Sequence, residues 1–211
     1  MWRKQLTIAV LVTVCTLVGH ATAQKNELSG LIGRTFISDQ IIPTSTSSDN
    51  LMRFGDGLSF EANYARRLMD FGLLSLSAEV PVVFNPDEDV HAALPSRVPE
   101  NYNSIIVTPA ARVNAFPDLG VSPWVSVGGG VAHYSNSSTL LFGGKNPGQS
   151  GTNAGVFQIG GGLDVKFFKK FSLRGELRDF WSGTPNLNVS TNKSRQHNLF
   201  VGGGIVWHFG R

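Results

Sequence analysis

The residues best suited to carry out chemistry are His133 and Ser135, which lie two positions apart in the segment HYSN. A histidine that accepts the proton of a serine hydroxyl turns that hydroxyl into a nucleophile for acyl transfer. Residues two apart in a strand point to the same face, so both side chains would share one surface. The acid that would orient the histidine is missing nearby, because no Asp or Glu occurs between Asn136 and Leu163. The pair is therefore interpreted either as an esterase site or as a chance order of two common residues.

The segments that would position this pair alternate between apolar and polar residues. In the segment 155–167, Phe157 and Ile159 share one face with other apolar residues, whereas Asp164 and Lys166 fall on the opposite face. A period of two is typical of a strand that is apolar on one side. The pattern predicts eight strands, at residues 28–38, 57–68, 73–84, 104–116, 123–135, 155–167, 171–178 and 198–209.

The first predicted strand is the least regular of the eight. Arg34 has the parity of Ile32 and Phe36, so an undisturbed strand would put this charge on the apolar face. One extra residue, a β-bulge, would turn it elsewhere. The sequence therefore predicts a bulge in this strand.

Long and short connections alternate between the predicted strands. The long polar segments are 39–56, 86–101, 135–153 and 182–196, and the short turns lie near 69–70, 116–121 and 169–170. Outer-membrane barrels combine long outer loops with tight periplasmic turns, and each strand crosses the membrane with only about 9 to 11 residues. The predicted fold is all-β, an eight-stranded antiparallel up-and-down transmembrane β-barrel.

The polar face of the sheet is predicted to line the lumen, because hydrocarbon cannot solvate charges. Glycines on this face, such as Gly160 and Gly162, would leave room for long arginine and lysine side chains. The interior of an eight-stranded barrel is just filled by side chains, so an open pore is not expected. The charges are nearly balanced, which favours mutual pairing. The predicted lumenal polar network consists of Glu61, Arg67, Glu79, Arg112, Asp164, Lys166, Arg174, Glu176 and Arg178.

Four aromatic residues are predicted to lie at the two membrane interfaces. Trp124 and Trp207 come at strand ends that carry short turns, and Tyr134 and Trp181 at strand ends that carry long connections. Trp and Tyr favour such interfaces because their rings are amphipathic.

The N-terminus is typical of an export signal, because Arg3 and Lys4 precede an apolar run and a small-residue cleavage site. We expect residues 1–23 to be removed and residues 24–211 to form the barrel domain. The net charge of +3 then falls, the only cysteine is lost, and the five histidines lack metal-ligand spacing. A nucleic-acid interface, a disulfide framework, a metal and other cofactors are therefore not expected.

On these features the mature chain resembles the small OmpA/OmpX-type outer-membrane β-barrels. The shared features include about eight alternating strands, glycine-rich strands such as SVGGGVAHY and QIGGGLDVKF, and a last strand that ends in aromatics. The resemblance implies a monomer in the cell outer membrane, in contact with outer-membrane lipids and lipopolysaccharide. It also implies that the outer-membrane assembly machinery reads the C-terminal strand. It implies no single activity, because this fold hosts adhesins, stabilisers, small channels and lipid-modifying enzymes.

Three functions remain open from the sequence. The first is a non-enzymatic integral barrel with a polar-plugged lumen and four long extracellular loops, in a structural, adhesive or interaction role with an unidentified loop partner. The second follows from the similarity of HYSN to the His-x-Ser-Asn motif of PagL-type lipid A deacylases, which implies an esterase that uses His133 and Ser135. The third is a soluble periplasmic barrel that binds a small ligand.

Overall fold

The computed structural model describes residues 26–43, 50–55, 57–92 and 97–210, and the predicted signal, residues 1–23, lies outside them. The described residues form eleven strands. They are β1 (Asn26–Ile37), β2 (Gln40–Ile41), β3 (Leu51–Phe54), β4 (Leu58–Asp70), β5 (Leu74–Ala92), β6 (Asn101–Val107), β7 (Ala110–Ala115), β8 (Val121–Asn136), β9 (Gly151–Phe168), β10 (Phe171–Gly183) and β11 (Arg195–Phe209). Within the described ranges, no helix has the length and apolar character needed to cross a membrane.

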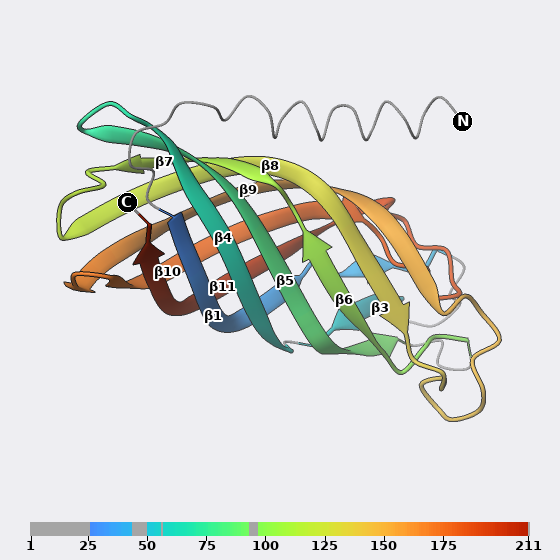
Figure 1. The fold of residues 1–211 in the computed structure, drawn as a ribbon. Helices are drawn as coiled ribbons and strands as arrows, with labels where there is room; N and C mark the ends of the chain where they lie inside the picture. The colour runs from blue at the N-terminus through green and yellow to red at the C-terminus, as the bar shows by residue number, and fades with distance from the viewer. Residues whose placement is uncertain (1–25, 44–49, 56, 93–96, 211) are drawn as a thin grey trace, which may run out of the picture.

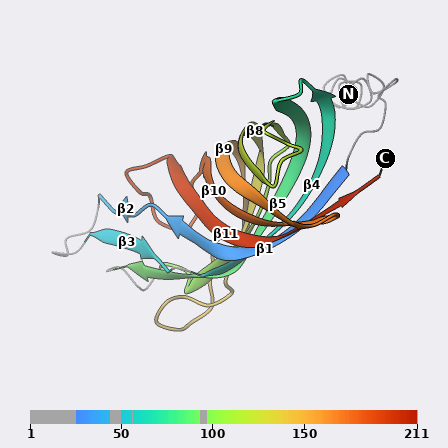
Figure 2. The same ribbon diagram turned by 90° about the vertical axis from the view of Figure 1, so that its left-hand side faces the viewer.

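The strands form one curved antiparallel sheet, as Figures 1 and 2 show. The main strands pair in the order β1, β4, β5, then β6 and β7 together, β8, β9, β10 and β11, and β11 pairs again with β1. The pairing is uneven, since β6 and β7 each pair with only part of β5 and β8. Counting β6 and β7 as one interrupted strand gives the eight predicted strands in up-and-down order.

The interruption between β6 and β7 falls at Thr108 and Pro109, within a segment predicted as one strand. Proline has no backbone N–H and cannot donate to a neighbouring strand, so it disturbs the ladder. Contact with the neighbours is kept by single hydrogen bonds, because Thr108 donates to the Pro81 carbonyl and Gly129 donates to the Pro109 carbonyl. The break therefore interrupts the strand without separating it from the sheet.

The predicted bulge in the first strand was wrong. The register of β1 against β11 runs without a shift from Asn26 opposite Phe209 to Ile37 opposite Asn198. Arg34 is exposed on the outer surface beside Ile32 and Phe36. It lies near the end with the long connections, where a long side chain can extend its charge toward water. The register shifts lie in β4, β5 and β10 instead.

The two ends of the sheet differ in their connections, as Figure 1 shows. Short turns, at 71–73, 116–120 and 169–170, lie at one end, on the left of the figure. The longer connections lie at the other end, where β2 and β3 form within the predicted first connection and β5 extends to Ala92. We call these the short-turn end and the long-connection end.

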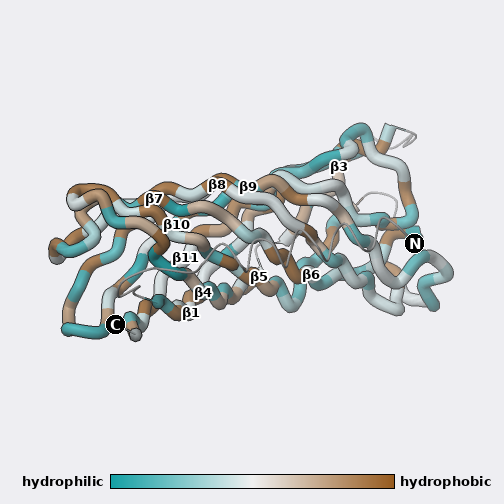
Figure 3. Tube along the Cα trace, turned by 45° about the horizontal axis from the view of Figure 1, so that its top comes forward, coloured by the Kyte–Doolittle hydropathy of each residue, from teal (hydrophilic) through white to brown (hydrophobic). Residues whose placement is uncertain are grey.

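Burial is inverted relative to a protein that folds in water. Large apolar residues such as Leu28, Ile159 and Val201 are exposed on the outside of the sheet, while charged residues such as Arg112 and Arg178 are buried inside. Figure 3 shows the alternation of hydrophobic and hydrophilic residues along the strands. Because the strand period is two, each strand contributes to both surfaces at once.

The interior itself has two parts. Near the long-connection end it contains an apolar cluster that includes Tyr102, Tyr134, Phe180 and Phe200. Side chains from the connections complete this cluster, and they include Ile42, Met52, Val98 and Leu187. Near the short-turn end the interior is charged. The buried arginines and their carboxylate partners are therefore concentrated in one half, whereas in the other half apolar side chains from the connections lie beside hydrogen-bonded polar residues such as Gln40 and Gln196.

Candidate functional site

Three arginines form the centre of the charged half of the lumen. Arg112 comes from β7, and Arg174 and Arg178 come from β10. All three are buried. The carboxylates around them come from five strands and are Glu27 of β1, Glu61 of β4, Glu79 of β5, Asp164 of β9 and Glu176 of β10.

Arg174 makes the most regular ion pair of the network. Its Nε and Nη2 donate to the two carboxylate oxygens of Asp164, each at 2.7 Å. Its Nη2 also lies 3.3 Å from Glu27 Oε2. Two parallel bonds between a guanidinium and a carboxylate fix orientation as well as distance.

Arg178 contacts three carboxylates. Its Nη1 donates to Glu79 Oε1 at 2.7 Å, and its Nε donates to Glu176 Oε1 at 2.6 Å. Its Nε also lies 3.4 Å from Glu61 Oε2. Gly160 stands opposite on β9, and a Cβ there would come within 2.9 Å of Arg178 Cγ. Gly160 therefore provides space for the arginine, as its place on the polar face predicts.

Arg112 joins the two halves of the network. It donates to Glu27 and to Glu79, the latter at 3.4 Å, while its Nε donates to Asn114 Oδ1 at 2.9 Å. Glu27 is shared with Arg174, and Glu79 is shared with Arg178. One continuous set of charge pairs thus runs across the lumen.

Trp124 lies among these arginines, and its predicted place at a membrane interface was wrong. The side chain is only 3% exposed, with the guanidiniums of Arg112, Arg174 and Arg178 at 5.6, 5.2 and 4.9 Å from its ring. The face of an indole attracts cations, so the ring adds to the network. Its Nε1 donates to Asp164 Oδ1 at 3.4 Å. Trp124 shares the parity of the inward residues of its strand. This parity predicts the buried position, whereas nearness to the strand end predicts the interface.

Tyr134 also lies inside, contrary to the prediction. It is 1% exposed, and its hydroxyl lies 2.6 Å from Ser182 Oγ. The apolar half of the lumen provides a place for the ring, and Ser182 partners the hydroxyl. The other two aromatics, Trp181 and Trp207, are 42% and 43% exposed on the outside, at opposite ends of the sheet. Only these two have the placement that an interfacial role requires.

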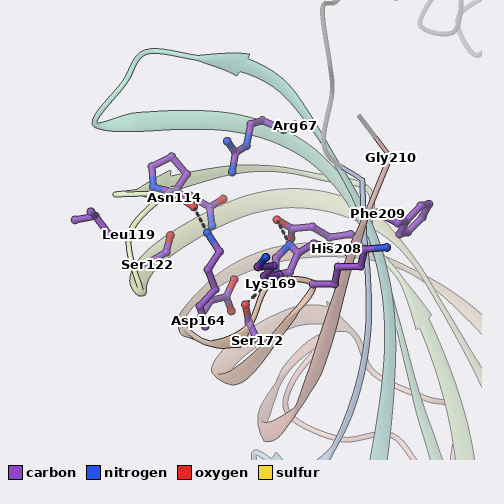
Figure 4. A pocket seen from close by; sticks show the side chains of 14 residues that line it. Arg67, Asn114, Leu119, Ser122, Asp164, Lys169, Ser172, His208, Phe209 and Gly210 are labelled. Atoms are coloured by element: carbon purple, nitrogen blue, oxygen red, sulfur yellow. Dashed lines mark hydrogen bonds and ion pairs between the residues drawn. The ribbon is translucent and has the colours of Figure 1, made fainter.

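Two predicted members of the network lie at its mouth. The short-turn end opens into a pocket of about 380 Å³, shown in Figure 4, and Arg67 and Lys166 form part of its wall. Arg67 Nη1 lies 3.1 Å from Asp70 Oδ2 and 3.4 Å from Asp118 Oδ1. Lys166 is exposed, and its Nζ donates to the Pro117 carbonyl at 3.5 Å. These residues belong to the rim, and the other seven predicted residues are buried in the lumen.

The sequence prediction missed Glu27 and His208. Glu27 lies one residue before the predicted start of the first strand, and its parity is that of Leu31, which points inward. His208 Nδ1 lies 3.6 Å from Glu27 Oε1, and its Nε2 lies 2.9 Å from Ser172 Oγ. Extending the first strand by one residue finds Glu27, and the inward parity that His208 shares with Val206 within the last predicted strand finds His208.

His133 and Ser135 lie on the outside of β8, near the long-connection end. Ser135 Oγ is 3.1 Å from His133 Nε2, and His133 Nδ1 is 2.7 Å from Asn153 Oδ1 on β9. When Nδ1–H donates to Asn153, Nε2 is free to accept the serine proton. Ser135, His133 and Asn153 thus form a hydrogen-bonded triad, which we call the Ser135 chain. Its third member is an amide, so looking for Asp or Glu in the sequence does not find it. The arrangement has the order nucleophile, base and orienting group.

Comparisons with known proteins identify the fold. No family model matches the chain, and no curated protein matches it. Among solved structures, the N-terminal β-barrel domain of Pseudomonas aeruginosa OprF is 15% identical with a TM-score of 0.51, over 89% of this chain and 100% of that domain. Neisserial surface protein A is 12% identical with a TM-score of 0.51, over 90% and 100%. The outer membrane protein OprG of Pseudomonas aeruginosa is 10% identical with a TM-score of 0.53, over 90% and 97%.

At these identities the likeness concerns the fold. It confirms the predicted fold class and the resemblance to small outer-membrane β-barrels. The outer-membrane location agrees with this fold and with the exposed apolar residues on the outside of the sheet. The charged lumen and the Ser135 chain come from the residues of this protein alone.

Replacing Arg112 with Ala is expected to lower the free energy of unfolding by about 3 to 5 kcal/mol, because Glu27 and Glu79 would each lose a buried cationic partner. Urea titration of the barrel in lipid vesicles measures the change. Lys145→Ala, at an exposed loop position, serves as the control and should have no effect. An Arg112→Ala barrel as stable as the wild type would contradict the lumenal network.

Proposed function

Because the chain has the fold of small outer-membrane β-barrels, we propose that it is a non-enzymatic integral protein of the outer membrane with a structural, adhesive or interaction role. The observation that carries this proposal is the inverted burial, in which apolar residues cover the outside and charges pair inside. In the third interpretation, a soluble periplasmic barrel, the same apolar surface would face water, which soluble proteins avoid over large areas.

The filled interior supports a protein that does not conduct solutes. Paired arginines and carboxylates occupy the interior near the short turns, and the apolar cluster with Tyr102 and Phe200 occupies the other half together with buried polar side chains. A small barrel has little interior volume beyond its own side chains. The work of the protein would then be done by its outer connections and its outer surface.

The proposed partners follow from this placement. Outer-membrane lipids and lipopolysaccharide would contact the exposed apolar residues of the strands. The assembly machinery would read β11, whose last residues include Trp207 and Phe209 with ring centroids 4.8 Å apart. We propose a monomer whose outer connections contact an extracellular partner.

If the long connections face the outside of the cell and the short turns face the periplasm, single cysteines at the two ends should differ in their accessibility to reagents added to intact cells. The only cysteine of the chain, Cys15, lies in the predicted signal. Phe142→Cys, in the connection between β8 and β9, should react with a membrane-impermeant maleimide on intact cells, because Phe142 is exposed at the long-connection end. Leu119→Cys, in an exposed short turn, should react only after the outer membrane is permeabilised. The reverse pattern would exclude outward-facing long connections.

A second candidate function, hydrolysis of a lipid ester, is favoured by the hydrogen bonds of His133 with Ser135 and Asn153. Ser135 Oγ would bond to the ester carbonyl carbon while its proton moves to His133 Nε2. The alcohol would then leave with that proton, and water would hydrolyse the acyl-serine. An amide orients the histidine but stabilises its protonated form less than a carboxylate does. The Ser135 chain would therefore activate its serine less strongly than a serine–histidine–acid triad does.

Mass spectrometry of lipids from expressing cells separates the two functions. The host should express the wild type, Ser135→Ala, Asn153→Asp and the control Ser138→Ala. A non-enzymatic barrel leaves all lipid masses equal to those of the empty host. Loss of an acyl chain with the wild type and with Ser138→Ala, but not with Ser135→Ala, would establish the esterase instead. Asn153→Asp should then increase the loss.

A further inference from the structure

A groove with both polar and apolar lining residues lies on the outside of the barrel near the long-connection end. It has a volume of about 710 Å³ and is lined in part by Asn153, Gly155, Gly183, Thr184, Ser194 and Arg195. These residues come from β9, β10, β11 and the connection between the last two strands. Gly155 and Gly183 carry no side chain, so the strand backbone is accessible between the polar groups. Space is available, because a Cβ at Gly155 would meet no atom within 4 Å.

The groove lies where the apolar outer surface ends. Along β9 the outward residues change from Ile159 and Phe157 to Gly155 and Asn153 toward the long-connection end. On β10 the exposed Trp181 lies at the same level, because it pairs with Phe157. Tryptophan on the outside of a barrel favours the level of the lipid headgroups. The groove is therefore at the height where headgroups meet the protein.

The charge at this groove is positive. The guanidinium of Arg195 stacks over the ring of Trp181, 5.0 Å from its centroid, and it pairs with no carboxylate among the described residues. Asp179 of β10 pairs instead with His197, whose Nδ1 lies 2.7 Å from Asp179 Oδ2. Arg195 is thus held in place by an indole, and its donors face no carboxylate in the described part of the chain.

We propose that this groove binds the phosphate of an anionic lipid headgroup, with Arg195 as its cationic partner. Guanidinium groups bind phosphate through paired hydrogen bonds. The hydroxyl groups of Ser194 and Thr184 line the same groove and supply further donors. The acyl chains of such a lipid would lie along the apolar residues below, from Phe157 to Ile159. The site borders Asn153 of the second candidate function and does not depend on hydrolysis.

Quenching of Trp181 fluorescence tests the proposal with the mature chain in neutral detergent micelles. Phosphatidylglycerol with a spin label on its acyl chain should quench in a saturable manner, and spin-labelled phosphatidylcholine should quench more weakly. Trp181→Phe identifies the part of the signal that comes from this ring. Arg195→Gln should weaken the binding of phosphatidylglycerol about tenfold, because a hydrogen-bonded charge pair is lost.

Further variants and a competition with inorganic phosphate test whether the groove binds the phosphate of the lipid. Gly155→Leu keeps the charge but fills the groove, and it should also weaken binding, whereas Arg97→Gln, outside the groove, should leave binding unchanged. Arg195→Lys should restore part of the affinity. Equal affinities of the wild type and Arg195→Gln would overturn the proposal. Displacement of the lipid by inorganic phosphate at equal concentration would assign the groove to a free anion and overturn the lipid assignment.

Discussion

Three guanidiniums, gathered round the indole of Trp124 and paired with carboxylates from five strands, hold the charged half of the barrel interior together. A buried charge is costly unless it is paired and hydrogen-bonded, so each of these groups requires the others. Glu27 of β1 and Arg174 of β10 belong to strands on either side of β11. The network therefore ties strands together across the lumen and along the sheet.

The apolar outer surface and the apolar cluster follow from this arrangement. A strand whose inward residues carry charge must expose its other face, and only a lipid environment accepts so many exposed aliphatic and aromatic side chains. The long connections return apolar residues such as Met52 and Leu187 to the other half of the lumen. The hydrogen-bonded Ser135, His133 and Asn153 and the groove beside Arg195 both lie on the outside, near the long-connection end.

The alternation of residues predicts most of this architecture, because strand period and lumen polarity are local properties of the chain. Seven of the nine predicted network residues are buried in the lumen. Nearness to a strand end predicts interfacial positions for Trp124 and Tyr134, whereas their parity predicts the inward positions that the structure has. The hydrogen bond between Asn153 and His133 could not be predicted, since it depends on the register of β9 against β8, which pairs the two residues. The bulge expected at Arg34 is absent because the end of the strand lets the charge reach water.

A double-mutant cycle on Arg178 and Glu79 tests the lumenal network most directly. Arg178→Ala, Glu79→Ala and the double variant are each unfolded by urea in lipid vesicles, and the free energies are compared with that of the wild type. The pair is buried and joined at 2.7 Å, so the account predicts a coupling free energy of about 1 to 3 kcal/mol. Effects that add to within about 0.5 kcal/mol would contradict it, because they would show that the two side chains do not interact in the folded barrel.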